Sequence, residues 1–166
     1  FGSGASSKVG SYAKMLGKKV LIVTDSGVVK AGILKGITDS LDESEVEYHV
    51  FDGVMANPID TMVEEEVRQL RQQKCDNIVA VGGGSSIDAA KGMALLATNP
   101  GRIADYALHT MQDLGKIKNH PLPFVAVPTT AGTGTEADCF AVITVVERRT
   151  KEGVGQLPLT PGGPHL

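Results

Sequence analysis

One stretch decides the fold: Ile78-Val79-Ala80-Val81-Gly82-Gly83-Gly84-Ser85-Ser86-Ile87-Asp88-Ala89-Ala90-Lys91. Its apolar start predicts a buried strand, the glycines predict a tight turn, and the residues after them predict a helix. Ser85 is expected to cap that helix, with Asp88 three residues further on, as in a capping box. The stretch therefore indicates a strand, a turn and a helix in direct succession.

This glycine turn is a candidate phosphate site. Backbone N–H groups at a helix start attract anions, and Gly82, Gly83 and Gly84 carry no side chain that would hold a phosphate away from the backbone. A plain tight turn is the alternative, although three successive glycines exceed what such a turn needs. The stretch is not a Walker A loop, since Lys91 is not placed as that motif requires. It is not GxGxxG either, because Ile87 stands at the third glycine position.

Alternating elements surround this stretch on both sides. Four further apolar runs predict strands at 20–24, 46–51, 124–127 and 141–145. Patterns with apolar residues on one face predict helices at 5–16, 28–41, 59–73 and 86–98. This alternation predicts an α/β fold with a mostly parallel sheet. Ligands of such sheets bind beyond the carboxyl ends of the strands.

Two other strand ends carry polar groups. The loop Pro128–Glu136 holds four threonines and two glycines, whose hydroxyl and N–H groups suit ribose and phosphate oxygens; a flexible loop is the alternative. Asp25 directly follows the first strand, where a carboxylate can accept both hydroxyls of a ribose and would repel a 2′-phosphate. On local grounds, an N-cap formed by Asp25 or Ser26 explains this position equally well.

Composition excludes several classes of function. The 166 residues suit one domain, with 42% apolar and 21% charged residues. A net charge of −3 provides no basic excess, so neither a nucleic-acid partner nor a membrane surface is expected. Aromatic residues make up only 4% and Trp is absent, which argues against base stacking. No apolar run reaches the roughly 18 residues of a membrane span.

Other reactive residues give weak signals. The two cysteines, Cys75 and Cys139, fit no metal or redox spacing and are interpreted as free thiols of a cytoplasmic protein. The histidines show no metal-binding spacing, and no catalytic triad can be assembled, so we assign neither metal ligands nor catalytic residues. The run 64–66 of three glutamates is interpreted as a solvated helix face, with Glu64 paired to Arg68.

Several motifs together resemble the iron-containing (group III) alcohol dehydrogenase family, which has a dehydroquinate-synthase-like fold. The resemblance covers roughly residues 1–151, and the pair GGGSxxD and PTTAGTGTE is its most specific part. It implies an N-terminal Rossmann-like domain, with helices on both faces of the sheet, that binds NAD. The motifs are Phe1-Gly2-Ser3-Gly4, Val23-Thr24-Asp25, Asn57-Pro58, Gly82 to Asp88, Pro128 to Glu136 and Ala141-Val142-Ile143-Thr144.

The resemblance also implies roles for individual residues. Asp25 would hold the adenosine ribose and favour NAD over NADP. The pyrophosphate would be bordered by Gly84, Ser85, Ser86, Ile87 and Asp88. Further cofactor-site positions are matched by Thr129, Thr130, Thr133, Asn57, Val142 and Lys151.

This sequence departs from the family pattern after the Lys151 position. The family binds Fe²⁺ or Zn²⁺ with an Asp and three His from a C-terminal helical domain, whereas residues 152–166 are rich in Gly and Pro and are predicted to be disordered. Where the family usually has Ile-Thr-Asp, this chain has Ile143-Thr144-Val145. We therefore expect domain boundaries at 1–151 and 152–166, and a truncated chain that lacks the metal ligands and is inactive alone.

The leading hypothesis is an NAD-binding domain of an NAD-dependent, iron-type alcohol dehydrogenase. Its partners would be NAD(H) and, in the intact enzyme, a small alcohol or aldehyde. One alternative is a non-catalytic nucleotide-binding or interaction fragment, whose exposed apolar interface would promote a homo-oligomer. Another is the cofactor domain of a relative of glycerol dehydrogenase or dehydroquinate synthase.

Overall fold

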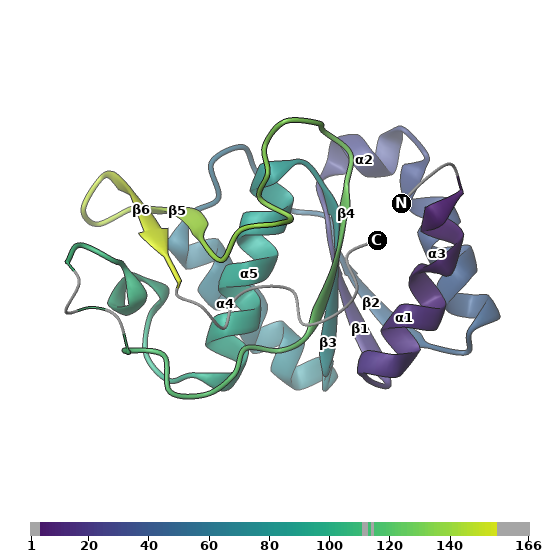
Figure 1. Ribbon diagram of the computed structural model, residues 1–166, viewed down its shortest axis with the longest axis horizontal. Coiled ribbons are helices and arrows are strands. Elements are labelled where there is room, and N and C mark those ends of the chain that lie inside the picture. The colour runs from purple at the N-terminus through teal and green to yellow at the C-terminus, as the bar shows by residue number, and fades with distance from the viewer. Residues whose placement is uncertain (1–3, 111–112, 114, 156–166) are drawn as a thin grey trace.

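The computed structural model describes residues 4–110, 113 and 115–155. A parallel sheet with the order β2-β1-β3-β4 forms its centre, which confirms the predicted α/β class (Figure 1). The four strands are β1 (Lys19–Val23), β2 (Glu47–Phe51), β3 (Asn77–Gly82) and β4 (Phe124–Pro128).

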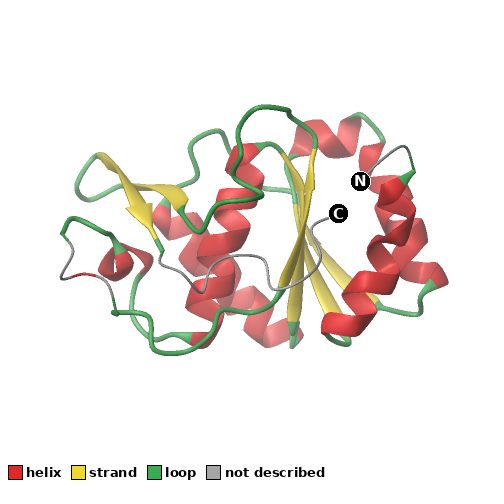
Figure 2. Ribbon diagram, in the orientation of Figure 1, coloured by secondary structure: helices red, strands yellow, loops and turns green. Residues whose placement is uncertain are grey.

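Helices cover both faces of this sheet (Figure 2). One face is covered by α1 (Val9–Leu16) and α3 (Ile33–Glu43), and the other by α4 (Asp60–Gln73) and α5 (Gly84–Thr98). The described residues also form the short helices η1 (Ala5–Lys8), α2 (Ser26–Lys30) and η2 (Ile103–Tyr106). Among the described residues, no helix has the length and apolar character that crossing a membrane requires.

The central strand β1 shows why the sheet is buried on both sides. Val20 and Ile22 belong to the core beneath α1 and α3, whereas Leu21 and Val23 belong to the core beneath α4 and α5. All four side chains are fully buried. Successive side chains of a strand point to opposite faces, so a continuous run of β-branched and aliphatic residues is what a doubly covered parallel strand needs.

The strand order creates a crevice between β1 and β3. From β1 the chain continues to β2 on one side, and from β3 it continues to β4 on the other side. The segments that leave β1 and β3 therefore diverge, and ligands of open α/β sheets bind at this point. Asp25 and the glycine turn, two of the three candidates at predicted strand ends, follow these two strands.

The fifth predicted strand lies outside the main sheet. β5 (Ala141–Val145) pairs antiparallel with β6 (Thr150–Val154) in a separate hairpin, with Ile143 opposite Glu152. The side chain of Ile143 is buried, whereas that of Val142 is 47% exposed. Such alternation is typical of a strand with one covered face.

This hairpin corrects the predicted domain boundary. β6 extends to Val154, so a boundary between 151 and 152 would divide a strand. Gly153 and Gly155 suggested irregular structure, but backbone pairing with β5 holds this segment in place. The remainder of the predicted disordered tail, residues 156–166, lies outside the described residues.

Three predictions about helices were inaccurate in detail. The single helix expected at 28–41 is divided between α2 and α3 by Gly32, whose φ of 72° is left-handed. The expected solvated face of three glutamates is wrong for Glu66, which is 6% exposed. The expected partner of Arg68 is also wrong, since Arg68 pairs with Glu65, while Glu64 accepts a hydrogen bond from the Ile103 N–H at 3.2 Å. Both cysteines are free thiols, as predicted.

Candidate cofactor cleft at the strand ends

The glycine turn is shaped by the close approach of Ser86. Gly82 has a φ of 156°, and a Cβ added there would lie 2.6 Å from the Ser86 Cβ. Real carbon atoms do not approach so closely without bonding, so only glycine fits this position. The backbone can therefore turn directly from β3 into α5.

The expected capping box is wrong. The N-cap of α5 is Gly83, no side chain caps the helix, and Ser85 lies inside its first turn. Asp88 does not reach back to the helix start, because its carboxylate is hydrogen-bonded to residues of another loop. A helix start capped by glycine leaves the space in front of it free of side chains.

The start of α5 offers N–H donors that have no hydrogen-bond partner among the described residues. The N–H groups of Ser86 and Ile87 both donate to the Gly83 carbonyl, at 3.1 and 3.2 Å. Those of Gly84 and Ser85 belong to the first helical positions, which have no acceptor inside the helix. Together with the partial positive charge of the helix N-terminus, they form an arrangement that suits an anion.

Asp25 takes the N-cap role, and its second oxygen faces the glycine turn. Its Oδ1 accepts hydrogen bonds from the N–H groups of Gly27 and Val28, at 2.9 and 3.1 Å, so Asp25 is the N-cap of α2. Its Oδ2 accepts a hydrogen bond from the Ser86 hydroxyl at 3.3 Å. The carboxylate thus lies between the ends of β1 and β3, with one oxygen devoted to the helix and the other facing the glycine turn.

These segments enclose an open cleft of about 560 Å³. Its wall includes residues that follow β1 and β3, where the sequence predicted a cofactor site, and the first two residues of the loop after β4. Apolar side chains of the segment after β2 and of α3 form another part of its wall. The lining residues are Asp25, Ser26, Gly27, Val28, Ile33, Val54, Met55, Ala56, Gly83, Gly84, Ser85, Ser86, Thr129 and Thr130.

The Thr-rich loop, residues 129–140, approaches the glycine turn directly. The Thr129 N–H donates to the Gly82 carbonyl at 2.9 Å. A Cβ added at Gly83 would lie 3.2 Å from the Thr130 Oγ1, and one added at Gly84 would lie 3.4 Å from the Thr133 Cγ2. The Thr-rich loop passes over the amino end of α5 in Figure 1, and the glycines allow the two segments to lie close together.

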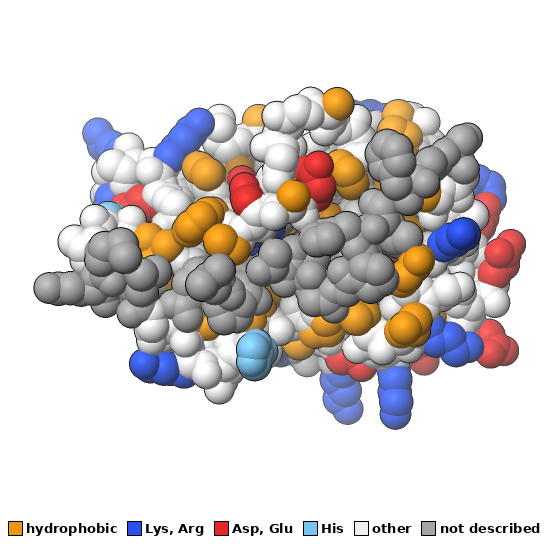
Figure 3. Space-filling model, viewed as in Figure 1, with side chains coloured by type: hydrophobic (Ala, Val, Ile, Leu, Met, Phe, Trp, Pro, Cys, Tyr) orange, Lys and Arg blue, Asp and Glu red, His pale blue; other side chains and the backbone are white. Residues whose placement is uncertain are grey.

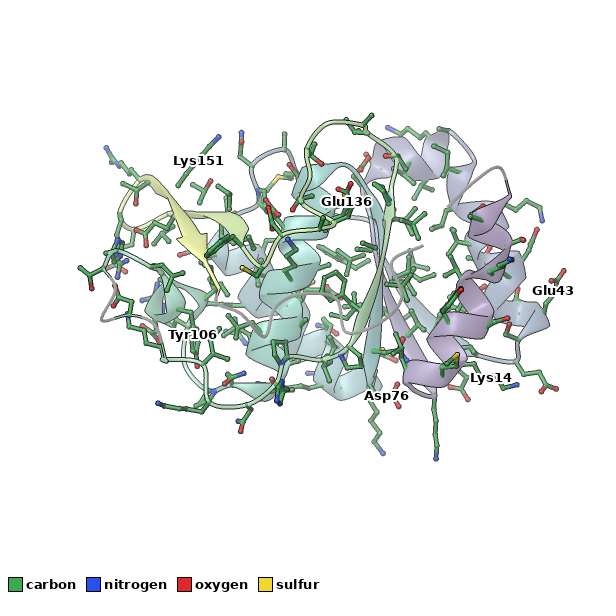
Figure 4. The ribbon with its side chains drawn as sticks, in the orientation of Figure 1. Lys14, Glu43, Asp76, Tyr106, Glu136 and Lys151 are labelled. Atoms are coloured by element: carbon green, nitrogen blue, oxygen red, sulfur yellow. The ribbon has the colours of Figure 1, made fainter. Side chains whose placement is uncertain are left out.

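Other predicted site residues lie away from the cleft. The Ile87 side chain is fully buried in the core. Asn57, which has a left-handed φ of 58°, accepts a hydrogen bond from the Lys151 Nζ at 2.7 Å, and this contact joins the segment after β2 to the hairpin. Val142 and Lys151 both belong to the hairpin, and Lys151 is labelled there in Figure 4.

Asp88 connects α5 to the Thr-rich loop and to β5. It accepts hydrogen bonds from the Thr135 hydroxyl and from the Val142 N–H, the latter at 3.1 Å. Burial raises the pKa of Asp88, while these two hydrogen bonds and the charge of Lys91 act in the opposite direction. The structure therefore shows Asp88 as a link between segments.

Sequence reasoning missed Lys91 and its partners. Lys91 is fully buried, and its ammonium donates to the Thr135 hydroxyl at 3.3 Å, to the Asp138 carboxylate and to the Phe140 carbonyl at 2.7 Å. The sequence did offer one signal: Lys91 stands about one helical turn after Asp88, among residues whose side chains are mostly small or apolar. A charged side chain in such a helix must either be buried with hydrogen-bonding partners or lie on the solvent-exposed face of the helix.

With this geometry defined, the family can be settled. A family model described as iron-containing alcohol dehydrogenase matches residues 1–162. The chain belongs to this family. Its fold and its two glycine-containing loops are therefore those of an alcohol oxidoreductase family, as the resemblance implied.

Individual members of the family are similar over almost the whole chain. Alcohol dehydrogenase 4 of Schizosaccharomyces pombe is 40% identical over 93% of this chain and 36% of its own length. The NAD-dependent methanol dehydrogenase of Bacillus methanolicus is 39% identical over 96% of this chain and 41% of its own. The crystal structure of an archaeal halo-thermophilic alcohol dehydrogenase from a Red Sea brine pool superimposes with a TM-score of 0.91 at 35% identity, covering 98% of this chain and 42% of that one. This chain thus spans about two fifths of the length of these relatives.

The iron of the family has no counterpart in the residues described here. Within 4–110, 113 and 115–155, no group of three or more His, Cys, Asp or Glu side chains is arranged to hold a metal ion. His109 instead lies 3.4 Å from the Glu152 carboxylate on the hairpin. On the face drawn in Figure 3, acidic and basic side chains of the described residues are interspersed, so this face presents no concentrated basic surface for a nucleic acid.

Proposed function

We propose that this chain binds NAD(H) in the cleft beyond the ends of β1 and β3. One observation carries the proposal: the glycine-capped start of α5 opens into the same cleft as the Asp25 carboxylate and the first threonines of the Thr-rich loop. A dinucleotide combines an anionic pyrophosphate with ribose hydroxyls, and this cleft offers donors for the first and acceptors for the second.

The pyrophosphate would lie against the glycine turn. The N–H groups of Gly84 and Ser85 provide donors, and the absence of a side chain at Gly83 allows phosphate oxygens to reach them. Ser86 and the backbone of Ile87 and Asp88 would form the rest of the surface around the pyrophosphate. The Asp88 side chain itself would act through the Thr-rich loop, since both of its oxygens already accept hydrogen bonds from that loop and from β5.

Asp25 would select NAD over NADP. Its Oδ2 has only a 3.3 Å contact with the Ser86 hydroxyl, so it retains acceptor capacity for a ribose hydroxyl. A 2′-phosphate at the same place would meet a carboxylate charge and be repelled. The NAD-dependent methanol dehydrogenase among the relatives agrees with this preference.

Of the remaining predicted residues, Thr129 and Thr130 line the cleft, and the others would extend the site beyond it. Thr129, Thr130 and Thr133 would contact the cofactor from the Thr-rich loop. Asn57, Val142 and Lys151 gather at the hairpin, where the contact between Lys151 and Asn57 supports a common location for these positions. These assignments come from the family pattern and from this clustering.

In the family context, a bound nicotinamide cofactor would supply the hydride-transfer chemistry between a small alcohol and its aldehyde. The described residues do not fit the family's iron or zinc, because they contain no suitable group of ligands. We therefore assign this chain the task of holding and orienting the cofactor, and assign it no chemical step.

Titration calorimetry of this chain with NADH up to millimolar concentration tests the proposal, with NADPH as the comparison. Saturable binding of NADH and weaker binding of NADPH are expected. A folded sample that shows no saturable heat with either nucleotide would mean that the glycine turn is only a turn in this chain.

A further inference from the structure

The Thr-rich loop faces the glycine turn without a hydrophobic core of its own. Most of its residues are exposed, and Thr135 is the one buried member of the loop. The Thr129 N–H donates to the Gly82 carbonyl, and the Ala137 N–H donates to the Gly134 carbonyl within a turn. Something other than apolar packing must therefore hold this loop at a fixed distance from α5.

Two side chains of α5 supply that connection. Lys91 reaches the Thr-rich loop at three points, namely the Thr135 hydroxyl, the Asp138 carboxylate and the Phe140 carbonyl. One helical turn earlier, Asp88 accepts hydrogen bonds from the same Thr135 hydroxyl and from the Val142 N–H. The Thr135 hydroxyl accordingly accepts from Lys91 and donates to Asp88, so it stands at the centre of the cluster.

The burial of Lys91 makes this cluster specific. A fully buried ammonium loses its hydration and must be compensated by well-placed oxygens. These oxygens come from the Thr-rich loop, so the loop can satisfy Lys91 only in a narrow range of positions. Glu136, labelled in Figure 4, lies in this segment above α5, immediately after Thr135.

We propose that Lys91 and Thr135 are positioning residues, which contact no cofactor themselves but hold Thr130 and Thr133 at the distance from the glycine turn that nucleotide binding requires. The proposal rests on the proposed NAD(H) binding, and it extends the site by two buried residues. Its geometric basis is the close approach of the loop to the turn. A Cβ added at Gly83 would lie 3.2 Å from Thr130, and one added at Gly84 would lie 3.4 Å from Thr133. A loop released from Lys91 would lose three of the contacts that hold it against α5.

The test uses variants of the central hydroxyl. Thr135→Val preserves the shape of the side chain and removes both hydrogen bonds, whereas Thr135→Ser retains the hydroxyl. Ile37→Val, in the core beneath α1 and α3, serves as a matched control that destabilises the chain away from the cleft. Lys91→Met is a second probe, and the Thr135 pair keeps the test valid if Lys91→Met does not fold.

Two readouts are measured at a temperature where every variant is folded. For Thr135→Val, we expect faster amide hydrogen exchange in residues 129–140 and NADH binding weakened by about tenfold. Thr135→Ser should remain within about twofold of the wild type, and Ile37→Val should change neither readout. A purely structural role would lower the melting temperature in both Thr135→Val and Ile37→Val and leave the NADH affinity of the folded chains unchanged.

The outcomes separate this proposal from the proposed function. If the wild-type chain binds no NADH, the proposed function fails, and hydrogen exchange alone decides whether Thr135 holds the loop. If NADH binds and Thr135→Val changes neither exchange nor affinity, the positioning role is overturned. Faster exchange with unchanged affinity also overturns it, because the loop position would then not matter for the nucleotide.

Discussion

The Ser86 hydroxyl donates a hydrogen bond of 3.3 Å to Oδ2 of Asp25, and this contact joins the ends of two neighbouring parallel strands. Asp25 follows β1 and Ser86 lies in the first turn of α5 after β3. The two residues are 61 positions apart in the sequence. The strand order, which places β1 beside β3, brings them to one cleft.

The two roles of Asp25 can be separated by substitution. Asp25→Ser keeps an oxygen that can cap α2 and removes the negative charge, whereas Asp25→Ala removes both. We expect both variants to bind NADPH more tightly than the wild type does, because the repulsion of the 2′-phosphate is lost. Only Asp25→Ala should also lose about 1 kcal/mol of stability through the missing cap. Fluorescence titration and thermal denaturation measure the two effects, and unchanged discrimination in both variants would remove Asp25 from the specificity argument.

The glycine requirement at the turn is testable without any ligand. Gly82→Ala should destabilise the fold by at least about 2 kcal/mol, since the new Cβ would clash with Ser86 and the backbone conformation is unfavourable for alanine. Gly36→Ala is the matched control, because Gly36 is exposed within α3 and its Cβ would meet open space. The control should gain about 0.5 to 1 kcal/mol from better helix propensity. Urea denaturation of both variants measures the contrast, and an equal effect at both positions would contradict the described turn.

Glu66 predicts a pH dependence of stability. Burial raises the pKa of Glu66 to about 7, and its Oε1 has no hydrogen-bond partner among the described residues. Because the folded-state pKa exceeds the ordinary value of 4.5, the chain is most stable below pH 4.5 with respect to this group and loses that stability as the pH rises through 7. Glu66→Gln should therefore be more stable than the wild type at pH 8, on the order of 2 kcal/mol, and should show no gain at pH 4.

Denaturant unfolding at the two pH values tests this prediction. The exposed neighbour Glu65 provides the control, since Glu65→Gln should show no comparable gain at pH 8. A stability difference between Glu66→Gln and the wild type that does not vary with pH would show that Glu66 does not titrate in this range.

Asp60 should hold the hairpin against α4. It is 1% exposed, and its Oδ1 accepts hydrogen bonds from the N–H groups of Thr61 and Val146, at 2.9 and 3.2 Å. Asp60→Ala should cost about 2 to 3 kcal/mol and accelerate amide exchange at Val146, because both donors lose a buried acceptor. Asp60→Asn retains an oxygen at this place and should cost less. Equal exchange at Val146 in the wild type and in Asp60→Ala would show that the hairpin is held by other contacts.

Local patterns predicted the sheet because its strands are independently recognisable. The run Val20–Val23 is apolar at every position, which only a strand covered on both faces requires, and the glycine turn marks the end of β3 without ambiguity. Asp25 was identifiable because parallel strands place their carboxyl ends at one edge of the sheet. The sequence could not decide between its two roles, and the structure shows the cap directly.

Several failures share one physical origin, which is dependence on contacts distant in sequence. β6 became a strand only through pairing with β5, and its glycines gave no local signal. Lys91 and Glu66 have ordinary surface chemistry, and their burial follows from the packing of α5 and α4 against other segments. The capping box failed because Asp88 has partners 47 and 54 residues away, which compete with the helix N-terminus for its carboxylate.

The most direct test of cofactor binding at the glycine turn compares Gly83→Asp with Gly83→Asn by NADH fluorescence titration. Both side chains are good N-caps of similar volume, and Gly83 has a φ of −79° that either residue can adopt, so both variants should fold. Only Gly83→Asp places a negative charge where the pyrophosphate would bind. We predict that the wild-type chain binds NADH and that Gly83→Asp binds it at least about tenfold more weakly than Gly83→Asn does. Equal NADH affinity in the two variants, or no NADH binding by the folded wild-type chain, would contradict it.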